Sequence, residues 1–235
     1  MFSIKDDRGY NQGFAPSKTL VIRTKRRCQI MMDEMELTKN VDVLEIGCGT
    51  GEISNLIAST SSAKVLGTDL CIPFIEEAKE KYILPNLSFE VLNFNKPETL
   101  QGKQFDYIIG NGILHHLYYN LDEALKNIRF LLKPNGKMIF LEPNLKNPYC
   151  YVIFSFPYFR KLAHLEPDEM AFTRKFIQNK LKTAGFQNIK VSYKDFLLPI
   201  IPVFLIKSVI FIGNIAEKIF GINRMSQSIF IVANK

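Results

Sequence analysis

The chain has 235 residues, 47% of them hydrophobic and 12% aromatic, and it contains no tryptophan. The length fits one domain with or without a modest cap, and the composition excludes a disordered chain. The formal charge of +7 includes an early basic group, Lys18, Arg23, Lys25, Arg26 and Arg27. Charge this sparse suits a phosphate-bearing or anionic-membrane partner as readily as nucleic acid, and a solvated helix face is the simpler interpretation.

An N-terminal helix is expected within residues 17–35, and strand and helix patterns alternate after it. The predicted strands are Val41–Ile46, Ala63–Asp69, Leu87–Asn93, Phe105–Gly110 and Lys137–Glu142. The predicted helices between them are Glu52–Ser59, Pro73–Tyr82 and Leu121–Leu132. Such alternation indicates right-handed βαβ units, and therefore an α/β fold with a doubly wound, mostly parallel sheet.

The alternation stops after the fifth strand. Residues Asn147–Leu165 are rich in tyrosine, phenylalanine and proline and are interpreted as an irregular insertion. A helix is expected over Glu169–Ala184, closed by Gly185, with strands at Phe186–Tyr193 and Ser228–Ala233. We expect one domain over residues 1–235, with apolar cap insertions at about 147–168 and 196–226.

The segment Phe196–Gly213 is almost wholly apolar, but Pro199, Pro202 and Lys207 interrupt it. A membrane span needs about 20 uninterrupted apolar residues, so a span is not expected. From Leu205 onward, apolar residues recur at steps of three and four, at Val209, Ile212, Ile215 and Ile219. This spacing predicts an amphipathic helix that covers the acceptor site; ordinary core, a homodimer interface and a membrane-facing surface are the alternatives.

The four cysteines, Cys28, Cys48, Cys71 and Cys150, form no Cys-x-x-Cys pair. Neither a zinc site nor a redox pair is therefore indicated, and no metal is expected. Met1–Tyr10 carries no secretory signal, so reduced thiols and a cytoplasmic location, with an alternative at the inner face of a membrane, are the expectation.

The most informative motif is Glu45-x-Gly47-x-Gly49-x-Gly51, which follows the first strand. Glycines let a backbone turn sharply and approach a ligand closely. Asp69 ends the second strand, where a carboxylate accepts hydrogen bonds from ribose hydroxyls. Dinucleotide enzymes use Gly-x-Gly-x-x-Gly, and Ser54 stands where their third glycine or alanine should be.

This motif resembles the first motif of class I S-adenosylmethionine-dependent methyltransferases, and the resemblance covers nearly the whole chain. Three later segments resemble the family as well: Leu92–Asn95, Phe105–Leu117, and the turn Leu131–Lys137, where Asn135 replaces a glycine. The resemblance implies a seven-stranded sheet whose last strand is antiparallel, and S-adenosyl-L-methionine as the cofactor. The residues expected to bind it are Glu45, Gly47, Cys48, Gly49, Gly51, Asp69, Leu70, Asn93, Phe94 and Asn111.

His115 follows the fourth strand, and Glu142 ends the fifth, which is expected to be its neighbour. A carboxylate there orients an imidazole that acts as a general base, and His116 is the second candidate. The alternative is that the histidines cap a helix or pack on the cofactor, and that Glu142 binds a backbone amide.

The leading functional hypothesis is methyl transfer to oxygen or nitrogen of a small, hydrophobic or lipid-linked acceptor recognised by the late insertions. An RNA or protein methyltransferase is the second hypothesis, although no Asn-Pro-Pro-Tyr-type motif stands at Asn111–Leu114 and nucleic acid is not the expected partner. A non-catalytic cofactor-binding module or a nucleotide-dependent oxidoreductase is the third. Peripheral membrane contact and a homodimer remain alternatives for the apolar cap.

Overall fold

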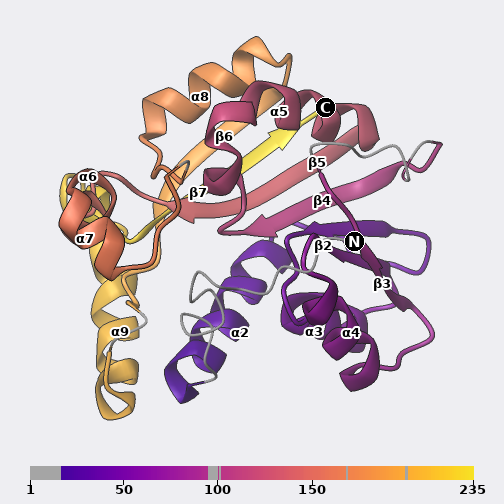
Figure 1. The fold of residues 1–235 in the computed structure, drawn as a ribbon, viewed down its shortest axis with the longest axis horizontal. Coiled ribbons are helices and arrows are strands. Elements are labelled where there is room, and N and C mark those ends of the chain that lie inside the picture. Colours follow the sequence, from indigo (N-terminus) through magenta and orange to yellow (C-terminus); the bar gives the residue numbers. More distant parts are fainter. Residues whose placement is uncertain (1–16, 95–99, 101, 168, 199–200) are drawn as a thin grey trace.

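A computed structural model of the chain describes residues 17–94, 100, 102–167, 169–198 and 201–235. Its centre is a sheet with helices on both faces (Figure 1). The strands are β1 (Asp42–Ile46), β2 (Lys64–Asp69), β3 (Leu87–Val91), β4 (Phe105–Asn111), β5 (Leu132–Pro143), β6 (Gln187–Lys194) and β7 (Ser228–Asn234).

The strands lie in the order β3-β2-β1-β4-β5-β7-β6. The first five pair in parallel, whereas β7 runs antiparallel to both β5 and β6. The chain therefore builds outward in one direction from β1 to β3, and in the other direction from β4. This order confirms the expected doubly wound sheet with an antiparallel last strand, and it places the switch point between β1 and β4.

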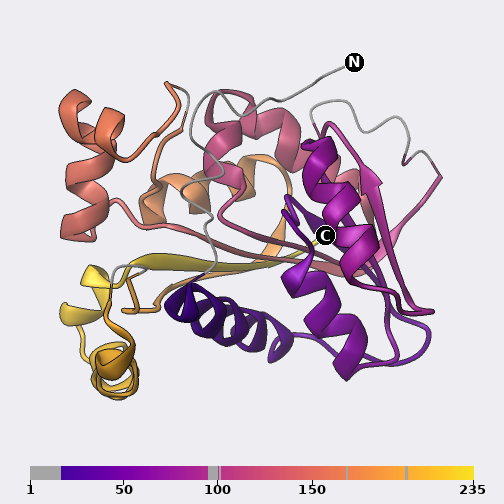
Figure 2. The ribbon, with the colours of Figure 1, turned by 60° about the horizontal axis from the view of Figure 1, so that its bottom comes forward.

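Helices α2 (Lys18–Met32), α3 (Glu52–Thr60) and α4 (Ile72–Lys81) cover one face of the sheet, and α5 (Leu121–Leu131) and α8 (Arg174–Thr183) cover the other (Figures 1 and 2). Their apolar faces form a core on each side. Met31 and Ile57 pack with Val43 on one side, and Leu125 and Ile177 pack with Ile108 on the other.

Two predicted turns have the expected left-handed backbone. Asn135 has a φ of 64° and Gly185 a φ of 82°. An asparagine tolerates this conformation better than other non-glycine residues, which is why the turn before the main part of β5 survives without a glycine at that place.

The prediction of an irregular insertion over residues 147–165 was wrong. This segment forms two helices, α6 (Pro148–Ser155) and α7 (Pro157–Leu162). Each begins with a proline, whose fixed φ and missing N–H are well suited to the first helical position. Asn147 caps α6, because its side-chain oxygen accepts a hydrogen bond of 3.1 Å from the Cys150 amide.

The helix expected from Glu169 begins five residues later, at Arg174. Before it, the chain is extended: the Phe172 amide donates to the Pro143 carbonyl at 3.0 Å, and the Phe172 carbonyl accepts from Leu145 at 2.9 Å. Thr173 then caps α8 through a bond from the Phe176 amide. The bridge to the end of β5 therefore keeps residues 169–173 out of the helix.

The C-terminal apolar segment contains the helix α9 (Ile206–Ala216), preceded by the turn η3 (Val203–Leu205) and followed by the turn η4 (Ile222–Met225). The predicted helix is thus present over part of its expected range, while residues 199 and 200 lie outside the described residues. In both ribbon views α6, α7 and α9 lie at one end of the molecule (Figures 1 and 2). Among the described helices, none has the length and apolar character to cross a bilayer.

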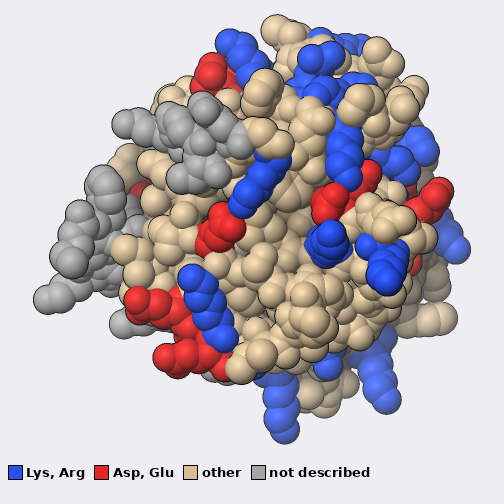
Figure 3. Space-filling view, turned by 90° about the vertical axis from the view of Figure 1, so that its right-hand side faces the viewer, with Lys and Arg blue, Asp and Glu red and all other residues tan. Residues whose placement is uncertain are grey.

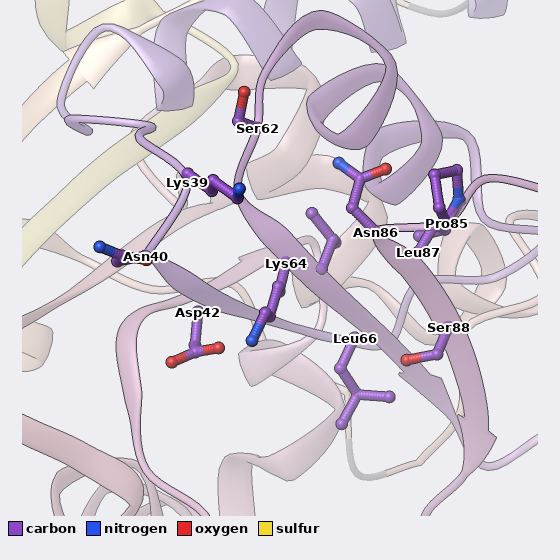
Figure 4. Close-up of a pocket in the computed structure, with 11 residues that line it drawn as sticks. Lys39, Asn40, Asp42, Ser62, Lys64, Leu66, Pro85, Asn86, Leu87 and Ser88 are labelled. Carbon is purple, nitrogen blue, oxygen red and sulfur yellow. The ribbon is translucent and has the colours of Figure 1, made fainter.

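The opposite end of the molecule has an ordinary charged surface, with basic and acidic side chains interspersed (Figure 3). A hollow of about 500 Å³ lies at the N-terminal ends of β1, β2 and β3, where Asp42, Lys64 and Asn86 line it (Figure 4). Ligands of open α/β sheets bind at the C-terminal ends of the strands. This hollow is therefore at the wrong edge of the sheet for the ligand that the glycine turn predicts.

Candidate active site

The glycine turn joins β1 to α3, and its three glycines all have positive φ: 67° at Gly47, 54° at Gly49 and 84° at Gly51. A Cβ at Gly47 would lie 2.7 Å from Ile113, and one at Gly51 would lie 2.7 Å from Phe89. At Gly49, a Cβ would meet nothing within 4 Å. Gly47 and Gly51 are therefore required by packing as well as conformation, whereas the backbone at Gly49 is open to an approaching ligand.

Asp69 stands beside this open backbone at the end of β2. Its Oδ2 accepts a hydrogen bond of 2.9 Å from the Gly49 amide, and its Oδ1 accepts one of 2.9 Å from the Cys71 amide. Burial raises the pKa of Asp69, opposed by the bonds from these amides and by the charge of His116. The carboxyl group is thus held next to the turn, where hydroxyl donors of a ribose would meet it.

Glu45 lies in the interior instead of on the open side of the turn. It is 1% exposed, and its Oε2 accepts a hydrogen bond of 2.5 Å from Ser54 Oγ. Burial raises its pKa to about 8. Cys48 is buried as well. In this structure the Glu45 side chain supports the first turn of α3, and its contact with a ligand stays a prediction.

The other expected cofactor residues follow neighbouring strands at the same edge of the sheet. Leu70 comes directly after β2 and is exposed, while Asn93 and Phe94 follow β3, the first half-buried and the second buried. Asn111 ends β4, and its Oδ1 accepts a hydrogen bond of 2.9 Å from Arg27 Nη1. The fold therefore gathers these residues at one edge, although the Asn111 side chain already has a partner on α2.

The structure brings His115 and Glu142 together. His115 lies in the helical turn η2 (Leu114–Asn120), and its Nδ1 is 2.9 Å from Oε2 of Glu142. Glu142 also accepts backbone amides at the start of η2, from Ile113 at 3.0 Å, Leu114 at 2.8 Å and His115 at 3.2 Å. One carboxylate therefore both holds the turn and orients the imidazole, so the two interpretations of Glu142 are compatible.

With Glu142 accepting from Nδ1–H, the Nε2 atom of His115 keeps its lone pair. Burial, together with the charge of His116, lowers the pKa of His115, and the bond to Glu142 acts in the opposite direction. A histidine with a lowered pKa is neutral at pH 7. His115 is thus in the protonation state and tautomer that a general base needs.

A second histidine–carboxylate pair lies beside the first. His116 Nδ1 is 3.1 Å from Glu169 Oε1, and the two imidazole centroids are 4.1 Å apart. Glu169 raises the pKa of His116. The potential ligand atoms of His115, His116 and Glu169 lie within 4.8 Å of one another, close enough for a metal ion. Each histidine already has a carboxylate partner, so two histidine–carboxylate pairs explain why these side chains lie so close together.

The cap encloses this cluster. Phe154 of α6 meets the His115 ring edge-on at a centroid distance of 6.0 Å, and the Met170 amide donates to the His115 carbonyl at 3.2 Å. His115 is consequently 7% exposed. Aromatic residues of the late insertion therefore border the residue expected to act as base.

Sequence reasoning missed Glu169 and Arg27. Glu169 was placed in a helix and received no role, and no local motif marks it. The sequence did contain an indication that Arg27 is buried. Arg27 stands seven residues after Leu20 and four before Met31, which places it on the apolar face of α2. A cation in that position is expected to be buried against a partner.

The early basic group is not the solvated helix face that its charge suggested. Arg27 is 5% exposed, and its Nε donates to Asp195 Oδ2 at 2.8 Å. Arg23 Nε and Arg26 Nε lie 3.9 Å and 3.8 Å from the same carboxylate. Three of the five basic residues thus face inward, because a buried acid at the end of β6 attracts them.

Comparison with known proteins agrees with this arrangement. The family model described as "Methyltransferase domain" matches residues 37–171. The highly reducing polyketide synthase NEC1 of Pyricularia oryzae is 29% identical over 194 residues, which are 73% of this chain and only 7% of that protein. The chain thus corresponds to a small part of this large relative.

Two solved structures share the fold. A SAM-dependent methyltransferase from Archaeoglobus fulgidus has a TM-score of 0.64 at 19% identity, covering 95% of this chain and 96% of that one. The CurJ carbon methyltransferase has a TM-score of 0.61 at 22% identity, covering 88% of this chain and 53% of that one.

Proposed function

Since the chain belongs to the methyltransferase-domain family and is a class I S-adenosylmethionine-dependent methyltransferase, we propose that it methylates a hydrophobic, lipid-like acceptor whose nucleophilic atom loses its proton to His115. The observation that carries this proposal is the contact of 2.9 Å between His115 and Glu142 at the C-terminal edge of the sheet.

The residues around the glycine turn fit the cofactor. Bound S-adenosylmethionine supplies a methyl group that its sulfonium charge has already activated. The open backbone at Gly49 leaves room beside the turn, and the Asp69 carboxylate is held there to accept from ribose hydroxyls. We assign the adenine contacts to Asn93 and Phe94, which follow β3.

The chain's part in the reaction is to position the acceptor and to take its proton. Positioning alone can lower a barrier by about 7–11 kcal/mol in favourable cases. Glu142 holds the His115 ring through Nδ1, and Nε2 receives the proton of the acceptor. The imidazolium that forms is then stabilised by the adjacent Glu142 carboxylate.

A base of this kind favours some acceptors over others. A neutral amine already carries a lone pair and attacks before it loses its proton. A hydroxyl group or an acidic C–H must lose its proton on the way to the transition state. The His115–Glu142 pair therefore favours oxygen among the acceptors expected from the sequence. The likeness to a polyketide synthase and to a carbon methyltransferase supports an acidic carbon as the second candidate.

The apolar character of the acceptor is inferred from the cap. Phe154 packs on His115, and the same insertion carries a set of ring contacts among Tyr151, Phe156 and Phe159. Apolar walls around a few polar groups are typical of small-molecule sites. RNA would instead be expected to meet a basic surface with aromatic platforms.

Three probes with the same alkyl chain test the proposal: a phenol, a 3-oxoacyl thioester and a primary amine. With methyl-labelled S-adenosylmethionine we expect label in the phenol or the thioester, and little in the amine. Preferred labelling of the amine would show that no base is needed. Labelling of RNA or protein substrates, with none of the three probes labelled, would contradict the small-molecule acceptor.

Replacing Asp69 with alanine is expected to weaken S-adenosylhomocysteine binding by about 1.5–3 kcal/mol, the range for hydrogen bonds to a charged group. That loss corresponds to roughly 10- to 150-fold in Kd by calorimetry. Asp122→Ala is the matched control, because Asp122 is exposed on α5. Unchanged affinity in Asp69→Ala would limit Asp69 to holding the Gly49 and Cys71 amides. NAD is expected not to bind.

A further inference from the structure

Helix α9 contacts the rest of the protein through both apolar and polar residues: Ile206 is buried, and Asn214 and Glu217 form hydrogen bonds. Asn214 accepts a hydrogen bond of 2.6 Å from Arg26 of α2. Glu217, which caps the helix, accepts from the Asp195 amide at 2.9 Å and from Lys194 at 3.0 Å. Gly213 lets the helix approach Phe196, because an added Cβ would lie 3.1 Å from the Phe196 Cβ. The contacts that attach the helix are therefore the buried Ile206 and Gly213 and the hydrogen bonds of Asn214 and Glu217.

The opposite side of α9 is apolar and open to solvent. Phe211 is 68% exposed and Ile212 is 62% exposed. The exposed apolar side chains of this region continue before and after the helix, and they are Val203, Phe204, Leu205, Phe211, Ile212, Ile215, Ile219, Phe220, Ile222 and Met225. We call this set the apolar face. It includes Leu205, Ile212, Ile215 and Ile219 of the predicted stripe, so the alternative of ordinary core does not hold for these four residues.

A surface helix in water normally turns its apolar stripe inward, whereas α9 and its flanking turns leave the ten apolar side chains of this set exposed. Single exposed apolar residues are common, but a contiguous set of this size marks a contact surface. A second group of exposed aromatic and aliphatic residues lies at the same end of the molecule, on α6 and α7 (Figures 1 and 2). It consists of Tyr151, Phe156, Tyr158, Phe159 and Leu162.

The charges around the apolar face have one sign. Lys207, Lys218 and Arg224 are exposed between its apolar residues. The acid within residues 201–225, Glu217, has a side chain that is 9% exposed and is paired with Lys194. Residues 146–162 contain no acid in their sequence. Residues 146–162 and 201–225 thus offer apolar and cationic groups to solvent, unlike the mixed surface at the other end of the molecule (Figure 3).

From this juxtaposition we propose that the apolar face of α9 and its flanking turns docks on an anionic lipid surface. The apolar side chains enter the boundary between headgroups and acyl chains, and the lysine and arginine side chains meet lipid phosphates. The protein lies on the membrane without crossing it. The inference depends on the surface alone and holds whichever acceptor is methylated.

A second copy of the chain is the other occupant to consider. A two-fold contact through the apolar face would bring Lys207, Lys218 and Arg224 of both copies into one interface, with no exposed acid in residues 201–225 to balance them. Like charges brought together disfavour such a contact. An anionic bilayer complements both the apolar character and the positive charge of this surface.

Flotation with phosphatidylcholine vesicles, with and without phosphatidylglycerol, tests the proposal. We expect binding to the anionic vesicles, weaker binding to neutral ones, and a loss of binding as salt is added. The double variant F211S/I212S should partition at least about tenfold more weakly, since two side chains no longer enter the lipid. K207E/K218E should weaken binding to the anionic vesicles and leave the little binding to neutral vesicles unchanged.

The matched control is I83S/F130S, which removes one isoleucine and one phenylalanine that lie away from the cap and are likewise exposed, at 86% and 67%. It should float like the wild type, and all variants should keep the wild-type melting temperature. Absence of wild-type binding, or equal losses in the control, would overturn the proposal. So would a dimeric mass by light scattering that halves in F211S/I212S. S-Adenosylhomocysteine affinity and methylation of a water-soluble probe should persist in F211S/I212S, which separates docking from the proposed reaction.

Discussion

Replacing His115 with alanine is expected to lower kcat by about 10²–10⁴-fold, the usual contribution of a positioned base. Binding of S-adenosylhomocysteine should change little, because the expected cofactor contacts come from the glycine turn and Asp69. The measurement is methyl transfer to whichever hydroxyl or carbon probe accepts label, with calorimetry and a melting curve on the same variant. Wild-type turnover in His115→Ala would reduce the residue to a structural role.

Three controls separate a base from other roles. His164→Asn changes the exposed histidine, whose φ is 54°, to a residue that tolerates this backbone, and it should be silent. Glu142→Gln should cost less than His115→Ala, because an amide oxygen still accepts from the backbone of η2. Dialysis against a chelator should leave turnover unchanged, whereas a metal held by His115, His116 and Glu169 would make it fall.

The pH profile gives an independent test of the same base. His115 must be neutral to accept a proton, and its pKa lies below the ordinary histidine value of 6.5. Activity should therefore be level through neutral pH and fall only when the pH drops below that value. Glu169→Gln removes the carboxylate that raises the pKa of His116, so His116 carries less positive charge beside His115. The charge of His116 lowers the pKa of His115 more than the charge of Glu169 raises it, so the acidic limb of the profile should move to higher pH. If the acidic limb of the pH profile stays at the same pH in Glu169→Gln, a group other than His115 controls it.

Asp195→Ala is expected to destabilise the fold by about 3–5 kcal/mol, because it leaves the buried Arg27 guanidinium without its carboxylate partner. Asp195 is 0% exposed and lies 2.8 Å from Arg27 Nε, and its Oδ1 accepts from the Leu197 amide at 3.0 Å. Its φ is 69°, a conformation that alanine adopts less readily than aspartate or asparagine. Urea denaturation followed by circular dichroism measures the loss.

Two further variants, Asp195→Asn and Asp122→Ala, serve as comparisons for this loss of stability. Asparagine keeps the backbone conformation and an acceptor for Leu197, so it should cost less than alanine. Asp122 forms an exposed pair with Lys180, and its loss should cost at most about 1 kcal/mol. The neighbouring arginines lower the pKa of Asp195. Its stabilising contribution is therefore present above the unfolded-state pKa and is lost as the pH falls through the folded-state pKa. A loss in Asp195→Ala no larger than in Asp122→Ala would contradict the buried-pair interpretation.

The parts of the site that the sequence predicted are those set by local constraints. The glycine turn requires positive φ at Gly47, Gly49 and Gly51, and side chains other than glycine rarely adopt it. Strand ends in a parallel sheet meet at one edge, so Asp69, Asn93 and Asn111 could be placed together from the order of strands alone. The proximity of His115 and Glu142 followed from the same reasoning, because β4 and β5 are neighbours.

The cap could not be predicted in this way. Proline and aromatic residues at 147–165 suggested irregular chain, yet Pro148 and Pro157 each begin a helix. A proline can end a helix or begin one, and the outcome depends on whether the residues after it pack against the core as a helix. The start of α8 was likewise decided by the pairing of Phe172 with the end of β5, a contact between residues distant in sequence.

By itself, the sequence determined the succession of strands and helices along the chain and the glycine turn, because each rests on backbone geometry within a few residues. The resemblance of that turn to the family motif indicated the cofactor class. Tertiary structure alone decided the pairing of Arg27 with Asp195, 168 residues apart, and of His116 with Glu169. It also decided the orientation of α9. Helical periodicity shows which residues share a face, but only the tertiary contacts of Ile206, Gly213 and Glu217 determine that Phe211, Ile212 and Ile215 point outward.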